Sequence, residues 1–230
     1  GERDFRSNEQ STTVTADSTL RIEHVAEDGS VSVLKDAVPV LAGEVIDATF
    51  MDAEALRSFL DREIAEARSS GILLSLHVKA TMMKVSDPII FGHAVRAYFS
   101  KVFAEFGDEL AAVGANPNNG LAAVLTAAET LPPSRHEAFL AAISATYESG
   151  PDLSMVDSDR GITNLHVPSD VIVDASMPAM IRNGGRLWDA SGATRDTKAI
   201  IPDSCYAGVY QAVIDDCRVN GALDPATIGT

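Results

Sequence analysis

The sequence predicts an α/β fold, with a mixed sheet flanked by helices and a β-hairpin region near the N-terminus. Three observations support this prediction. Short β-type runs crowd residues 12–50, apolar residues farther along recur at helical spacing, and strand-like apolar runs alternate with those helical segments. The chain has 230 residues, of which 46% are hydrophobic, so it can bury the core of one large domain or two small ones.

The hairpin region is predicted from two runs of residues. Residues 19–35 read as two short strands around Asp28-Gly29, a pair that is typical of tight turns. Residues 42–51 continue the β character. A helix is expected next, with Asp52 as its N-cap and Gly71 past its end. Its apolar residues lie three and four positions apart: Leu56, Phe59, Leu60, Ile64 and Ala67.

Residues 72–80 are predicted to form a strand. Because side chains alternate along a strand, Ser75, His77 and Lys79 share one face, which becomes polar toward the carboxyl end. A helix is then expected to start at Asp87-Pro88, with Asp87 as the cap and the proline in the first turn. The apolar stripe of that helix consists of Phe91, Ala94, Val95, Tyr98, Val102 and Phe106.

The remainder of the chain continues the alternation of helices and strands. The expected elements are a loop at 115–120, helices near 121–130 and 135–148, a buried strand ending at Asp174, a short helix closed by Gly184, and a last helix that ends at Gly221.

Composition and charge narrow the class of protein. The formal charge of −15 disfavours a general nucleic-acid-binding surface, although a few local cations in a cleft could still bind an anion. Two cysteines form no disulfide framework, which favours a reducing cytoplasm. The sequence has no apolar run of membrane-spanning length and no visible signal peptide.

Lys79 is the first candidate for chemistry, because ligands of α/β sheets bind outside the carboxyl ends of strands. A lysine there could hold a carboxylate or, if desolvated, act as a base with a depressed pKa. A surface lysine on a half-exposed strand is nevertheless favoured by the pattern alone. His77 could line the same cleft, but a structural hydrogen-bonding histidine is favoured. Lys84 could help to bind an anion, but a solvated loop lysine is clearly favoured.

Asp174 is the second candidate. A carboxylate at the end of a buried strand is a natural ligand for Mg²⁺ or Mn²⁺, and it is equally suited to cap the next helix, so the pattern favours neither role. Asp157 and Asp159 fail the calcium-loop pattern, because Gly161 comes one position early, and they are interpreted as a turn. No complete nucleotide-phosphate motif is present in the sequence.

Three long stretches go further than these short patterns. Residues 76–95 (LHVKATMMKVSDPIIFGHAV), 155–182 and 201–217 closely resemble the monomeric NADP-dependent isocitrate dehydrogenases of bacteria. The likeness extends over nearly the whole chain and is weakest at 107–152. Because these strings are long and unusual, the match is far more specific than any short motif.

The resemblance implies an isocitrate/isopropylmalate dehydrogenase-like fold and the oxidation of isocitrate by NADP⁺, with release of CO₂ to give 2-oxoglutarate. It implies that Lys79 contacts isocitrate and takes part in proton transfer at the C2 hydroxyl. It also implies that Asp174 ligates Mg²⁺ or Mn²⁺, which polarises the C2 oxygen. Lys84 belongs to the same motif as Lys79 but receives no catalytic role.

The resemblance further implies that residues 1–230 are a single α/β fragment, one half of the duplicated second domain of a longer, monomeric enzyme. The chain opens without an initiator methionine and stops in a loop-like segment, which fits such a piece. The cofactor-binding domain, the NADP-binding residues and further substrate and metal residues are expected outside this stretch. The isolated chain is therefore expected to be catalytically silent.

The expected partners are isocitrate and the remainder of the parent enzyme, in the cytoplasm, with no nucleic acid and no membrane. Self-association of the fragment stays open. Two other functions also stay open, namely a non-catalytic binding or regulatory module with the same fold and a related decarboxylating dehydrogenase for another 2-hydroxy acid.

Overall fold

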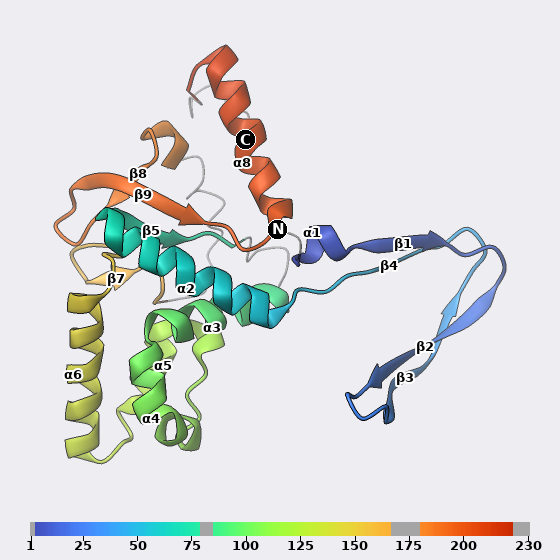
Figure 1. Ribbon diagram of the computed structural model, residues 1–230, viewed down its shortest axis with the longest axis horizontal. Helices are drawn as coiled ribbons and strands as arrows, with labels where there is room; N and C mark the ends of the chain where they lie inside the picture. Colours follow the sequence, from blue (N-terminus) through green and yellow to red (C-terminus); the bar gives the residue numbers. More distant parts are fainter. Residues whose placement is uncertain (1–2, 79–84, 167–179, 223–230) are drawn as a thin grey trace.

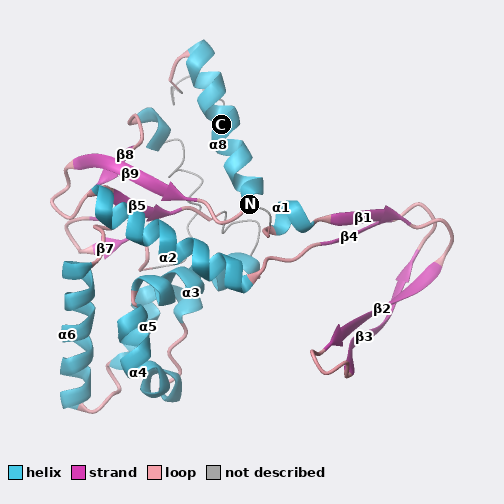
Figure 2. Cartoon of the chain, viewed as in Figure 1, coloured by secondary structure: helices cyan, strands magenta, loops and turns pink. Residues whose placement is uncertain are grey.

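The computed structural model describes residues 3–78, 85–166 and 180–222. It confirms the predicted α/β class, because helices pack around a mixed sheet and a β-hairpin arm extends from the N-terminal part of the chain (Figure 1). Figure 2 shows the same division by secondary structure, with a body of helices and a short sheet, and an arm made only of strands and turns.

The arm consists of two antiparallel pairs of strands. β1 (Gln10–Thr13) pairs with β4 (Val45–Ala48), and β2 (Ser18–Val25) pairs with β3 (Val31–Val40) beyond them. At the tip, the Asp28 carboxylate accepts a hydrogen bond from the backbone N–H of Ser30 at 2.9 Å, and Gly29 has a φ of +82°. The predicted turn at Asp28-Gly29 is therefore confirmed.

The sheet of the body has the order β5-β9-β8. β5 (Leu73–Leu76) and β9 (Thr194–Ile200) run parallel, and β8 (Arg186–Trp188) runs antiparallel to β9. A separate short pair is formed by β6 (Met155–Asp157) and β7 (Ile162–Thr163). β5 is shorter than the strand predicted over 72–80, and all four of its residues are buried, so it is not a half-exposed strand.

Helix α2 (Ala53–Ser70) begins and ends where the sequence predicts. The Asp52 carboxylate accepts hydrogen bonds from the backbone N–H groups of Glu54 at 2.9 Å and Ala55 at 3.0 Å. Gly71 follows the last turn with a φ of +64°, a conformation that glycine adopts without a steric penalty.

Two helices replace the single one predicted after Asp87-Pro88. α3 (Ser86–Tyr98) and α4 (Ser100–Ala112) are separated at Phe99, whose φ and ψ are −97° and 32°. Phe99 is fully buried, and its ring packs edge-on against Tyr98 and Tyr147. The predicted stripe is buried throughout, so the pattern was right about the buried face and wrong about continuity.

The short helix α1 (Phe5–Asn8) was not predicted from the sequence. The remaining elements lie close to their predicted positions: the 3₁₀ turn η1 (Pro117–Asn119) within the predicted loop, α5 (Gly120–Ala128), α6 (Pro133–Ser149) and α8 (Ser204–Asn220). The main core lies between α2, β5 and helices α3–α6, where the fully buried rings of Phe106 and Phe139 meet edge-on. Within the three described ranges, every helix is too short or too polar to cross a membrane.

Candidate functional site

The candidate site lies at the carboxyl edge of the parallel pair β5 and β9. Parallel strands end at the same edge of a sheet, and each of these two is followed in the chain by a helix, α3 after β5 and α8 after β9. Ligands of α/β sheets bind at such an edge. The residues that follow β5 therefore set the chemistry of this site.

The end of β5 is held from two sides. The backbone N–H of His77 donates to the carbonyl of Ile200 at 2.9 Å, which extends the ladder with β9. On the other side, the amide side chain of Asn164 accepts from the backbone N–H of Leu76 at 2.6 Å and donates to the carbonyl of Leu76 at 3.2 Å. Asn164 thus takes the place of a neighbouring strand, and the position where β5 ends is fixed.

His77 is a buried, hydrogen-bonded histidine, which confirms the structural role favoured by the pattern. The residue is 2% exposed, and its ring Nε2 lies 2.9 Å from the hydroxyl of Ser75 while Nδ1 contacts the hydroxyl of Tyr210 from α8. Burial lowers the pKa of His77 to about 4, so the ring is neutral at pH 7. One ring nitrogen then donates and the other accepts, so Ser75 and Tyr210 take opposite hydrogen-bonding roles.

Asp87 does not cap α3, contrary to the prediction. The helix begins at Ser86, Val85 occupies the cap position, and no side chain bonds there. Asp87 lies inside the first turn and is 4% exposed, and its Oδ2 has no hydrogen-bond partner among the described residues. Burial, followed by the negative charge of Asp203, raises the pKa of Asp87 to about 6.

The start of α8 shows the contrasting case of a buried carboxylate that is satisfied. Asp4 is also 4% exposed, but it accepts hydrogen bonds from the backbone of Ser204 at 2.8 Å and of Ser7 at 3.0 Å. Burial alone would raise the pKa of Asp4, yet the hydrogen bonds from Ser204 and Ser7 outweigh it and hold the pKa well below its usual value. Asp203 caps the same helix by accepting from Cys205 N–H at 3.2 Å. Among the described residues of this edge, Asp87 therefore stands out because one of its buried carboxyl oxygens has no hydrogen-bond donor.

The residues predicted to carry the chemistry lie outside the described part of the chain. Lys79 and Lys84 fall in 79–84, between His77 and α3, and Asp174 falls in 167–179. Their convergence on one cleft therefore stays a prediction. The structure adds Asn164, Tyr210 and Asp87, none of which the sequence patterns had pointed to as parts of this edge. The sequence does carry one signal for Asp87, because this aspartate stands at the start of an apolar helix. That signal was interpreted as a helix cap.

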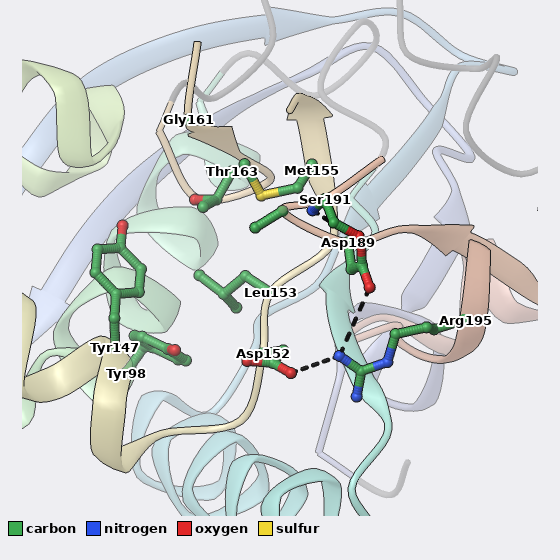
Figure 3. Close-up of a pocket in the computed structure, with 11 residues that line it drawn as sticks. Tyr98, Tyr147, Asp152, Leu153, Met155, Gly161, Thr163, Asp189, Ser191 and Arg195 are labelled. Atoms are coloured by element: carbon green, nitrogen blue, oxygen red, sulfur yellow. Dashed lines mark hydrogen bonds and ion pairs between the residues drawn. The ribbon is translucent and has the colours of Figure 1, made fainter. Parts of the chain in front are cut away.

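A cavity of about 460 Å³ lies on another side of the body, bordered by Tyr98, Tyr147, Leu153 and the start of β9 (Figure 3). The guanidinium of Arg195 lies there 2.5 Å from Asp152 and 4.0 Å from Asp189, and it donates to the carbonyl of Gly71 at 3.0 Å. Its charge is thus already matched by carboxylates. The cavity offers no free cation for an anionic substrate among the residues described around it.

Asp157, interpreted from the sequence as part of a turn, is the last residue of β6. Its carboxylate accepts from the backbone N–H of Arg160 at 3.1 Å, and Gly161 has a φ of +68°. The turn is confirmed. Within the described ranges, no group of three histidine, cysteine or acidic side chains is close enough to hold a metal ion.

Comparison with known proteins gives a consistent result. The family model for monomeric isocitrate dehydrogenase matches residues 1–230. A Corynebacterium glutamicum protein named isocitrate dehydrogenase [NADP] is 58% identical over 227 residues, which covers 99% of this chain and 30% of the relative. An Azotobacter vinelandii protein of the same name is 50% identical and matches 99% of this chain, which covers 31% of the relative. A Mycobacterium tuberculosis protein named isocitrate dehydrogenase [NADP] 2 is 46% identical and also matches 99% of this chain, which covers 30% of it. The chain thus corresponds to less than a third of the length of these relatives.

Proposed function

Because the chain belongs to the monomeric isocitrate dehydrogenase family, we propose that it is part of an enzyme that oxidises isocitrate with NADP⁺ and releases CO₂ to give 2-oxoglutarate. The observation that carries this proposal is the family match over all 230 residues, together with relatives, 46–58% identical, that are named isocitrate dehydrogenase [NADP]. The longer polypeptide that would contain residues 1–230 is called the parent enzyme below.

Lys79 is proposed to contact isocitrate and to take part in proton transfer at the C2 hydroxyl. Support comes from its place in the sequence, two residues after His77, whose backbone and ring are both held by hydrogen bonds. A rigid strand end limits where the next residues of the chain can lie. Positioning of this kind is what proton transfer between a side chain and a substrate requires.

Asp174 is proposed to bind Mg²⁺ or Mn²⁺. Its carboxylate provides the oxygen ligands that these cations prefer, which fits a metal of this class. When bound, such a cation would supply Lewis-acid polarisation of the C2 oxygen of isocitrate. As the resemblance implies, the remaining ligands are expected from other parts of the parent enzyme.

NADP is proposed to bind through the other parts of the parent enzyme, because the sequence has no nucleotide-phosphate motif. The residues of this chain then contribute part of the isocitrate and metal site and leave hydride acceptance to the rest of the enzyme. We propose a cytoplasmic location, in line with the free thiols of Cys205 and Cys217.

An assay of NADPH formation with isocitrate and Mn²⁺ tests the proposal on two proteins, the parent enzyme and the 230-residue chain. The parent enzyme is expected to turn over, and the isolated chain is expected to be silent. A parent enzyme that binds isocitrate without turnover would point to a non-catalytic module. Preference for another 2-hydroxy acid would point to a related decarboxylating dehydrogenase.

A further inference from the structure

The outer half of the arm, formed by β2 and β3, extends away from the helices and sheet of the body (Figures 1 and 2). In the part of the chain that the structure describes, these two strands form a two-stranded sheet of their own. An isolated two-stranded hairpin is only marginally stable in water, because it has too little apolar surface to bury by itself. The arm therefore depends on a surface that the described residues, 3–78, 85–166 and 180–222, do not provide.

One side of the arm presents an apolar face near its tip, formed by Val25, Val31 and Val33 and called the valine face here. Val25 lies directly opposite Val31, and Val33 lies opposite Glu23, so the three valines share one side of the hairpin with the Glu23 side chain at its edge. The exposed fractions of the three valines are 62%, 54% and 50%. Ser32 and its partner His24 occupy the opposite side, where Leu34, the residue after Val33, is 68% exposed.

The whole chain exposes more surface than a compact protein of its size. Its accessible surface is 13,631 Å² for a mass of 24.3 kDa. A compact monomer of that mass exposes about 10,000 Å². The excess of roughly 3,600 Å² is larger than one partner's share of an obligate interface, which is about 1,000–2,500 Å². The surface of the chain therefore fits a part of a larger assembly.

We infer that the valine face docks against a segment of the parent enzyme outside residues 1–230, within the same polypeptide. This inference rests on the proposed function, namely that the chain is part of a larger enzyme. Two observations favour that occupant over a second copy of the chain: the relatives have more than two thirds of their length outside the matched region, and the matching family is described as monomeric.

The chemistry of the arm also describes the surface that receives it. Residues 18–40 contain four carboxylates and two cationic side chains: Glu23, Glu27, Asp28 and Asp36, with Arg21 and Lys35. Arg21 and Glu23 already form an ion pair at 2.6 Å. The complementary surface is therefore an apolar patch for the valines with a rim that is modestly positive.

Hydrogen exchange measured on the unaltered proteins tests the inference. Backbone amides of residues 18–40 are expected to exchange at least about tenfold more slowly in the parent enzyme than in the 230-residue chain, at a protein concentration where light scattering shows the parent to be monomeric. Equal exchange in the two proteins would overturn the inference. Protection that appears only when the parent enzyme dimerises would also overturn it, in favour of a second copy.

A matched pair of variants tests the face itself in the parent enzyme. Replacing both Val31 and Val33 by lysine should abolish the protection of residues 18–40, whereas Ser32→Lys on the opposite side should retain it. Loss of protection in both variants, or in neither, would contradict docking through the valine face. The comparison of unaltered proteins remains decisive if the double variant does not fold.

These readouts are independent of catalysis. A parent enzyme without isocitrate dehydrogenase activity but with a protected arm would overturn the proposed function and leave the docking intact. An active parent enzyme whose arm amides exchange freely would support the proposed function and overturn the docking.

Discussion

At the scale of single residues, Lys79 is the most direct test of the proposed chemistry. In the parent enzyme, Lys79→Met should lower kcat by about 10²–10⁴-fold, because methionine has a similar shape but cannot exchange a proton. The matched control is Lys84→Met, which removes a lysine of the same motif to which no catalytic role is assigned. NADPH formation with isocitrate and Mn²⁺ measures both variants.

Folding must be separated from catalysis in that comparison. Both lysine variants should show the far-UV circular dichroism and the thermal midpoint of the unaltered enzyme. Near-normal turnover of the Lys79 variant would contradict the assigned role, and an equal loss in the Lys84 variant would assign the effect to the motif rather than to one side chain.

Asp87 predicts an unusual dependence of stability on pH. Its pKa is about 6 in the folded chain against an ordinary value of 3.8, so the folded state binds more protons between these values. The stability that the protonated carboxyl allows is then lost as the pH rises from about 4 to about 6. Asp87→Asn should raise the free energy of unfolding of the 230-residue chain by about 1–3 kcal/mol at pH 7 and change it little at pH 4.

Asp4 provides a control in which the same substitution should change the free energy of unfolding in the opposite direction. Its carboxylate receives hydrogen bonds from Ser204 and Ser7, so Asp4→Asn should lower the free energy of unfolding at pH 7. Urea unfolding at several pH values measures both variants. Destabilisation by Asp87→Asn at pH 7 would show that the Asp87 carboxylate has a favourable partner in solution. His77 titrates in every variant and therefore cancels in the comparison.

At the scale of elements, local signals were sufficient where a helix end depends on one residue. Asp52, Gly71 and Gly221 mark the ends of α2 and α8 in the structure as they do in the sequence. Asp87 was misread because an aspartate can either cap a helix from outside or lie buried within its first turn. Sequence spacing alone does not distinguish these two positions. The contact of Asn164 with Leu76 joins residues 88 positions apart, so no local pattern reveals it.

Asn164 therefore supports a prediction at this scale. Asn164→Ala removes both hydrogen bonds to the backbone of Leu76 and leaves a buried N–H and carbonyl unpaired, which should destabilise the 230-residue chain by about 2–3 kcal/mol. Asn220→Ala, at an exposed position near the end of α8, should cost less than about 0.5 kcal/mol. Urea unfolding compares them, and equal effects would show that Asn164 does not hold the end of β5.

At the scale of the whole molecule, periodicity predicted which faces are buried inside the body, but it could not say what lies outside the chain. Two short strands around the turn signal at Asp28-Gly29 indicated a hairpin in residues 19–35, and the hairpin is present. A two-stranded hairpin needs a covered side, however, and among the described residues nothing covers the valine face, whose side chains are 50–62% exposed. The candidate site is incomplete in the same way. Lys79 and Asp174, which were identified by resemblance, need further ligands and a cofactor from elsewhere in the parent enzyme.

An isolated chain with an uncovered valine face is expected to self-associate. Burial of apolar surface favours association, and the formal charge of −15 opposes it, so association should increase with protein concentration and also with salt, which screens the charge. Light scattering should then give a mass above 24.3 kDa that returns toward that value on dilution. Lysine at both Val31 and Val33 should suppress the increase, whereas Ser32→Lys should not. A constant mass of 24.3 kDa at all concentrations and salt levels would show that the face stays exposed in water without driving association.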